Sequence, residues 1–263
     1  MATEVLIVIP TLGQRVDYLR QTLESIRNQQ VEADITVVTP ESATAARALA
    51  QEFGAKVIED PSSLPAAINL GVSAAGMQHR YVNWLGDDDL LTDHSLEATI
   101  GALRANPRAV VTYGSCRYID PQGKELWVSK AGKWADRILT WGPDLIPQPG
   151  MLIRKEAWDM VGGVDESLSH AFDLDLLLKL KVQGEFTPVD QIVSCFRWHP
   201  ESLTVSDRSK SLNESEEIKR RYLSPRQAKV KWLWEQPVRV ATRIAAQRLN
   251  KRAYRLSAAK TSG

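Results

Sequence analysis

Short apolar runs alternate with segments of helical apolar spacing along the first part of the chain. Short apolar runs rich in β-branched residues predict strands at about residues 4–12, 33–40, 55–60 and 81–85. Apolar residues three or four positions apart predict helices between them, at about residues 16–29, 43–53 and 64–76. We therefore expect an α/β fold with a mostly parallel central sheet flanked by helices.

The second part of the chain has longer and less regular elements. Two strands are predicted around a turn at 121–123, and a strand, a short helix and a glycine pair follow within 143–163. Residues 171–184 predict a helix that Gly184 ends, and 191–206 predict a strand that runs into a polar loop. We divide the chain into two halves of one domain, 1–115 and 116–224, and a tail, 225–263.

The tail differs from the body in its charge. After Pro225 it holds ten Lys and Arg residues and one Glu, roughly +9, whereas the whole chain carries +1. Apolar residues fall on one side of a helix predicted from Pro237 onward: Val238, Ala241, Ala245, Leu249, Ala253 and Leu256. Trp232 and Trp234 are of a type favoured at membrane interfaces. The pattern predicts a basic amphipathic helix on an anionic membrane surface. A helix packed on the acidic body, or a mobile tail, is the alternative.

The composition is that of a globular protein, with 43% hydrophobic and 25% charged residues. No apolar run approaches the ~20 residues of a transmembrane helix, and no signal peptide pattern is present. We expect a cytoplasmic protein, peripheral on the inner face of the membrane if the tail binds there. Cys116 and Cys195 have no metal or redox spacing and are expected to be reduced core residues. No nucleic-acid-binding motif accompanies the basic tail, so we expect no nucleic acid partner.

Three consecutive carboxylates, Asp87, Asp88 and Asp89, follow the strand predicted at 81–85. We call them the acidic triplet. Adjacent like charges repel, so the triplet needs either water, as in a solvated turn, or a cation. In parallel α/β sheets ligands bind outside the carboxyl ends of the strands, where Asp60 and the loop 10–15 are also expected. The convergence of these three segments favours a divalent cation.

Five motifs in order resemble the family 2 glycosyltransferases of the GT-A fold. They are VIPTLGQRVDYLRQTLESIRNQ, VIED, INLGVSAAGMQHRYVNWLGDDDLL, IPQPGMLIRKEAWDMVGGVDESLSHAFDLDLLLKL and FRWHPESLT. The resemblance implies a Rossmann-like GT-A domain that moves a sugar, with inversion, from a nucleoside-diphosphate sugar to a hydroxyl of a glycan or lipid-linked acceptor. Cell-surface polysaccharide synthesis is the implied setting. Residues 1–115 would be the nucleotide-sugar-binding half and 116–224 the acceptor-binding and catalytic half.

The resemblance also implies which residues contact the nucleotide-sugar. They are Pro10, Thr11, Arg15, Asp60, Asn69, Asp87, Gln148 and Arg197. Asp60 would accept a hydrogen bond from a ring N–H of the base. This favours uracil or thymine, although a guanine edge also donates, and we expect a UDP-linked donor. A solvated strand end is the simpler role for Asp60. An exposed pair with Asp17 is the simpler role for Arg15.

The metal implied by the resemblance is Mn²⁺ or Mg²⁺, which would offset the charge of the leaving diphosphate. Asp88 is its principal predicted ligand, with Asp89 and His199 as further ligands. The family motif is usually Asp-x-Asp-Asp, but Gly86 stands where the first Asp would be. Asp87 is therefore expected to contact the ribose in its place. A phosphate contact, or a packed or solvated side chain, is the alternative for His199.

Inverting transfer needs one general base near the acceptor hydroxyl. Asp173 and Asp175 open the helix predicted at 171–184 and point about 200° apart, so they cannot serve one site equally. The resemblance selects Asp173, whose carboxylate the helix dipole also stabilises, and leaves Asp175 as a structural anchor. A helix cap is the simpler role for Asp173.

Two other functions remain from the sequence. A sugar nucleotidyltransferase would need a Gly-rich loop and a Lys, whereas the first loop reads IPTLGQR. A non-catalytic relative that binds nucleotide-sugars is motivated by Gly86. Metal-dependent donor hydrolysis without an acceptor would separate an enzyme from such a binder.

Overall fold

The computed structural model of the chain describes residues 3–59, 63–129, 132, 134–198, 208–223, 229, 232, 237 and 240. Within these ranges the strands are β1 (Val5–Pro10), β2 (Asp34–Thr39), β3 (Lys56–Glu59), β4 (Tyr81–Trp84), β5 (Leu90–Leu91), β6 (Ala109–Ile119), β7 (Glu125–Ser129), β8 (Leu152–Arg154) and β9 (Glu185–Arg197). The helices are α1 (Val16–Arg27), α2 (Thr44–Glu52), α3 (Leu64–Ser73), α4 (Ser95–Ala105), α5 (Ala135–Ile138), α6 (Lys155–Val161), α7 (Phe172–Gln183) and α9 (Arg208–Tyr222).

All of these strands join one sheet in the order β3-β2-β1-β4-β8-β6-β9-β5, with β7 paired to β6. Strands β1 to β4 run parallel, as the alternating pattern predicts. The short strand β8 lies between β4 and β6 and is antiparallel to both, while β6 and β9 are parallel. The α/β fold is confirmed, and the sheet is mixed because β5, β7 and β8 are antiparallel to the strands beside them.

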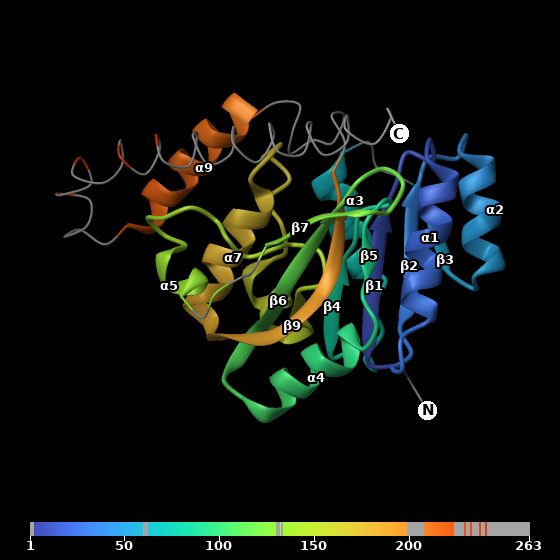
Figure 1. The fold of residues 1–263 in the computed structure, drawn as a ribbon, viewed down its shortest axis with the longest axis horizontal. Helices are drawn as coiled ribbons and strands as arrows, with labels where there is room; N and C mark the ends of the chain where they lie inside the picture. Colours follow the sequence, from blue (N-terminus) through green and yellow to red (C-terminus); the bar gives the residue numbers. More distant parts are fainter. Residues whose placement is uncertain are drawn as a thin grey trace.

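Helices cover both faces of the sheet (Figure 1). Along β1, Leu6 and Val8 pack with α3, α6 and α7, whereas Val5 and Ile7 pack with α1, α2 and α4. This alternation gives a central strand two apolar faces. Helix α3 approaches β1 so closely at Gly71 that a Cβ there would lie 2.2 Å from Cγ1 of Val8. The core therefore consists of two apolar layers, one on each side of the sheet.

The predicted β6–β7 hairpin, the helix that ends at Gly184 and the strand β9 are confirmed. Strand β5 and helices α4 and α9 are elements that the sequence pattern did not indicate. Strand β6 crosses the boundary predicted at 115/116, and strands from both sides of it share the sheet. The tail predicted for 225–263 lies almost wholly outside the described residues. No helix within the described ranges combines the length and apolar character needed to cross a membrane.

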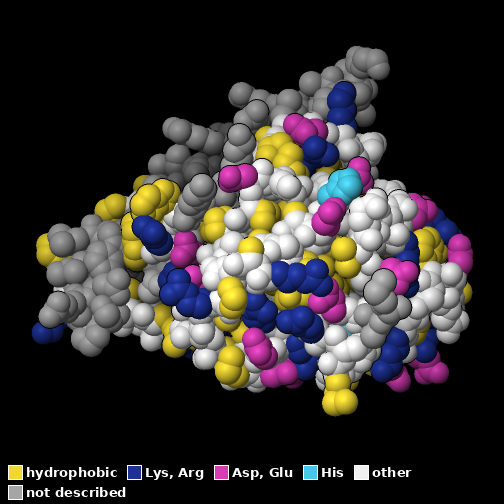
Figure 2. Space-filling view, turned by 90° about the horizontal axis from the view of Figure 1, so that it is seen from below, with side chains coloured by type: hydrophobic (Ala, Val, Ile, Leu, Met, Phe, Trp, Pro, Cys, Tyr) yellow, Lys and Arg dark blue, Asp and Glu magenta, His cyan; other side chains and the backbone are white. Residues whose placement is uncertain are grey.

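The face that carries α4, at the amino ends of β1 and β4, mixes basic and acidic side chains (Figure 2). Arg104 pairs with Glu4 there, and Arg108 Nη2 lies 3.0 Å from Glu185 Oε1. Such exposed pairs contribute little to stability. The acidic triplet lies at the opposite, carboxyl ends of these strands.

Candidate active site

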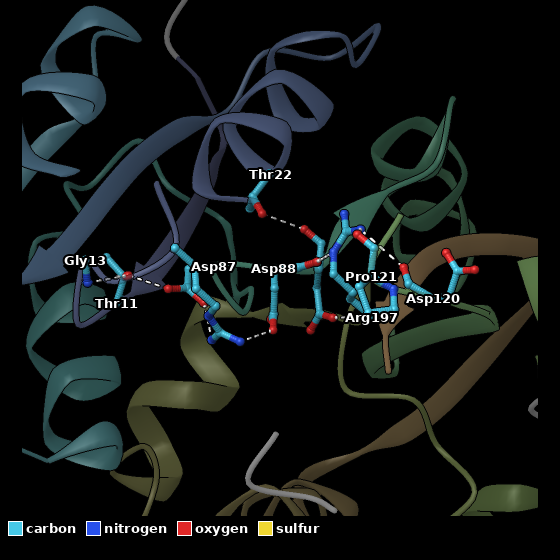
Figure 3. A network of polar contacts seen from close by, with 10 residues as sticks. Thr11, Gly13, Thr22, Asp87, Asp88, Asp120, Pro121 and Arg197 are labelled. Carbon is cyan, nitrogen blue, oxygen red and sulfur yellow. Dashed lines mark hydrogen bonds and ion pairs between the residues drawn. The ribbon is translucent and has the colours of Figure 1, made fainter. Parts of the chain in front are cut away.

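The first loop and the acidic triplet meet at the carboxyl ends of β1 and β4 (Figure 3). Pro10, the buried last residue of β1, leads to Thr11, whose Oγ1 donates to Oδ2 of Asp87 at 2.5 Å. The Arg15 guanidinium bridges two acids, with Nη2 2.7 Å from Oδ1 of Asp87 and Nη1 2.7 Å from Oδ2 of Asp88. Two carboxylates of the triplet therefore converge on one positive charge.

Backbone hydrogen bonds hold the first loop in place. The Thr11 N–H donates to the Val38 carbonyl at 2.9 Å, and the Gly13 N–H donates to Thr11 Oγ1 at 2.9 Å. Gly13 has φ of 74°, and a Cβ there would lie 2.5 Å from the Cβ of Ala43. Both the conformation and the space thus require glycine. The loop presents Arg15, just before α1, to the end of β4.

Gly86, the departure from the usual family motif, fits the packing of the acidic triplet. A Cβ at this position would lie 2.9 Å from Oδ2 of Asp89 and 3.0 Å from Oδ1 of Asp88. Any side chain at position 86 would therefore push on two carboxylates. The absence of a side chain at Gly86 therefore leaves room for the Asp88 and Asp89 carboxylates.

Burial sets the electrostatics of the triplet. It raises the pKa of the Asp87 carboxyl, and the Thr11 hydroxyl and the Arg15 charge offset this only in part. Burial, followed by repulsion from Asp88, raises the pKa of Asp89 well above its usual range. Burial therefore disfavours the charged forms of Asp87 and Asp89, and positive charge such as that of Arg15 favours the charged form of Asp87.

Asp89 and Arg197 form a second network beside the contacts of Arg15. Figure 3 shows Arg197 between Asp88 and the Asp120–Pro121 segment. Asp89 Oδ1 accepts from the Arg197 backbone N–H at 3.1 Å. The Arg197 guanidinium is buried and donates to the Asp88, Asp120 and Pro121 carbonyls and to the Gln21 side chain. It also stacks 4.3 Å from the ring centroid of Tyr18. In this arrangement its donors are directed at protein acceptors, whereas the sequence predicted a diphosphate contact.

Two further residues predicted to contact the donor hold neighbouring segments together. The Asn69 side chain donates to the Val164 carbonyl at 2.9 Å and accepts from the Val164 N–H at 3.0 Å, which ties α3 to the loop after α6. Gln148 Nε2 donates to the Trp84 carbonyl at 2.8 Å, at the end of β4. Gln148 therefore lies next to the segment that leads to the triplet, and Asn69 serves the packing of the loop 162–166.

Aromatic packing joins the end of β4 to the start of α7. The Trp84 ring lies 6.4 Å from that of Phe172 and 6.0 Å from that of Trp158, measured between centroids. Phe172 directly precedes Asp173, and Trp84 lies three residues before Asp87. The predicted base and the acidic triplet are thus carried by segments that pack against each other.

Asp173 lies in a group of acids at the start of α7. Its Oδ1 accepts from the Leu174 N–H at 2.8 Å, and burial raises the pKa of its carboxyl. Loss of water around Asp144 and the nearby Asp173 charge raise the pKa of Asp144 to about 7. Asp144 lies in an irregular segment and Glu214, which also acts on Asp173, in a polar helix. No sequence motif pointed to either residue.

The structural role predicted for Asp175 fits its contacts. It is buried, lies 2.7 Å from Nζ of Lys179 and accepts from the Tyr222 hydroxyl at 3.2 Å.

Asp60 and His199 lie outside the described residues. Within the described ranges, no three His, Cys, Asp or Glu side chains gather to hold a metal ion.

Comparison with known proteins identifies the family of the chain. The sequence model described as Glycosyl transferase family 2 matches residues 6–159, more than half of the chain. The chain belongs to this family. The match includes the first loop and the acidic triplet, whereas Asp173 and α9 lie beyond it.

Individual relatives of this family 2 protein are distant. An uncharacterized glycosyltransferase of Rickettsia prowazekii is 25% identical over 184 residues, which are 66% of this chain and 57% of the relative. Chondroitin synthase of Escherichia coli is 28% identical over 115 residues, 43% of this chain and 16% of that enzyme. A similar glycosyltransferase of Rickettsia bellii is matched over 27% of its length. The chain thus spans about half or less of these three relatives.

Solved structures show the same fold. TarS of S. aureus, residues 1–349 in complex with UDP-GlcNAc, superposes with a TM-score of 0.61 and 13% sequence identity. The superposition covers 84% of this chain and 70% of the TarS chain. The GT-A fold expected from the five motifs is therefore confirmed.

Proposed function

We propose that this family 2 glycosyltransferase moves a sugar from a UDP-linked donor to a hydroxyl of a glycan or lipid-linked acceptor, with inversion. The observation that carries the proposal is the convergence of Asp87 and Asp88 on the cationic Arg15 at the carboxyl ends of β1 and β4. Structural neighbours crystallised with UDP-GlcNAc and with UDP support a uridine donor. The chondroitin synthase relative supports a role in polysaccharide synthesis.

The residues of the site match the groups of a nucleotide-sugar donor. Thr11 and Asp87 would position the ribose, and Arg15, which already bridges carboxylates, would exchange them for phosphate oxygens. Asp88, with Asp89 and His199 as further predicted ligands, would hold Mn²⁺ or Mg²⁺, which supplies positive charge to the leaving diphosphate. The Asp87 and Asp88 carboxylates fit a cation because they already surround one.

Asp173 would act as the general base. Its carboxylate takes the proton of the acceptor hydroxyl while the acceptor oxygen bonds to the anomeric carbon and the bond to the diphosphate breaks. Burial raises the pKa of Asp173, which makes the carboxylate a better proton acceptor near neutral pH. Attack from the side opposite the leaving group inverts the anomeric carbon.

A cytoplasmic location, with the basic tail on the inner membrane surface, remains our proposal for the protein's setting. Each Lys or Arg near an anionic surface contributes about 1 kcal/mol, so several of them would hold the enzyme reversibly near a lipid-linked acceptor.

The test is a thermal-shift screen of nucleoside diphosphates with Mn²⁺ or Mg²⁺, because a ligand that binds only the folded state raises its melting temperature. UDP with a divalent ion should stabilise the protein most. Equal stabilisation by all nucleotides, or none by any, would contradict a uridine donor site.

A further inference from the structure

Helix α9 packs on α7, the helix that begins with Phe172 and Asp173 (Figure 1). Both helices lie outside the segment that the family model covers. Ile218 of α9 is fully buried in the same apolar layer as the α7 leucines. At the end of α9, the Tyr222 hydroxyl bonds to Asp175 of α7. The two helices are therefore joined both by apolar packing and by a hydrogen bond.

Glu214 of α9 binds the backbone that leads into α7. Its carboxylate accepts from three successive N–H groups: Ser169 at 3.1 Å, His170 at 2.7 Å and Ala171 at 2.6 Å. Helix α7 has no side-chain cap of its own at Ala171. Charge-assisted bonds of this kind are among the stronger hydrogen bonds, so Glu214 fixes where α7 begins.

The charge of the Glu214 carboxylate also affects Asp173, the predicted base. Burial raises the pKa of Asp173, and the Glu214 charge raises it further. Partial burial also raises the pKa of Glu214, but the three N–H groups lower it more, so this carboxyl stays ionised at neutral pH. Glu214 thus places a lasting negative charge near the Asp173 carboxylate.

The other charged groups around this site are few within the described ranges. Asp144 lies near enough to Asp173 for their charges to interact. Lys219 of α9 bonds to the Gly142 carbonyl and lies near Asp144, and His170 lies near Glu214. On α7 itself, Asp175 is paired with Lys179.

We propose that Glu214 is a positioning residue for the transfer reaction: it fixes the start of α7 and, through its charge, tunes Asp173 as a proton acceptor. This inference rests on the proposed function, in which Asp173 is the base. Glu214 does not touch the substrate in this role, since its oxygens are bound to backbone N–H groups.

Full-length Glu214→Gln and Glu214→Ala proteins separate the two effects. The Gln variant keeps an oxygen for the N–H groups but loses the charge, so the acidic limb of its kcat profile should shift to lower pH. The Ala variant loses both, so kcat should also fall by roughly tenfold to 100-fold with the donor KM unchanged. Glu217→Gln is the matched control, because Glu217 pairs with Arg221 on the exposed side of α9.

Circular dichroism melts establish that each variant is folded before its kinetics are compared. Folded Gln and Ala variants with the parent's kcat and pH profile would overturn the inference. A shift of equal size in Glu217→Gln would overturn it too. If the unchanged protein turns over no UDP-sugar at all, the proposed function fails and the inference falls with it.

Discussion

Arg197 is predicted by its contacts to stabilise the fold, and the change Arg197→Met tests this. The residue is 1% exposed, and its guanidinium makes four hydrogen bonds, to three carbonyl oxygens and the Gln21 side chain. A hydrogen bond from a charged donor contributes about 1.5–3 kcal/mol, but such terms are not additive and Met retains part of the packing. We expect the free energy of unfolding to fall by about 3–5 kcal/mol. This is a large share of the ~5–15 kcal/mol by which a typical domain is stable.

Urea denaturation of the parent and the variant measures this difference. Arg20→Met is the matched control, because Arg20 pairs with Glu52 at the surface with nearly half of its side chain exposed. We expect the control to lie within about 0.5 kcal/mol of the parent. A stably folded Arg197→Met protein that has lost UDP binding would refute the structural role and support the diphosphate contact predicted from sequence.

Three further predictions address the metal, the acids and the tail. Asp88→Ala should keep the fold, lose turnover and weaken metal-dependent UDP binding in calorimetry, whereas unchanged affinity would remove Asp88 as the ligand. Asp144→Asn should raise the melting temperature more at pH 8 than at pH 5, because a carboxyl with a folded pKa of about 7 is unfavourable once ionised; an equal gain at both values would contradict this. A protein ending at Pro225 should no longer sediment with anionic vesicles at low salt but should still hydrolyse donor, and equal sedimentation would show that the tail serves another purpose.

The fold was largely predictable because residues 4–85 combine continuous apolar runs, which reflect strands buried on both faces of a sheet, with apolar residues at helical spacing between them. The convergence of the first loop with the triplet also followed, since parallel strands end at one edge. The ion-pair and hydrogen-bond partners of each acid could not be predicted from the sequence. Whether Arg15 pairs with Asp17 or bridges Asp87 and Asp88 depends on the path of the loop, which the conformation of Gly13 sets.

Other features depend on tertiary contacts that leave a weak signal in the sequence. Arg197 shares the alternation of Val193 and Cys195 in β9, and that register places it in the interior. This alternation indicates a buried position for Arg197, but the charge of an Arg side chain favours an exposed position in a prediction from sequence. Helix α9 is mostly polar, and its few apolar contacts, such as Ile218, give no clear stripe. Glu214 therefore appeared as one surface acid among several.

The proposed transfer reaction is tested most directly by the release of UDP from UDP-sugars with Mn²⁺, compared between the unchanged protein and Asp173→Asn. The Asn variant keeps the shape of the side chain and removes its capacity to accept a proton. We expect release by the parent, inverted configuration in the sugar product, and turnover lower by roughly 100-fold to 10,000-fold in the variant with nearly unchanged donor affinity. Near-normal release by Asp173→Asn, or a retained configuration, would contradict the proposed reaction.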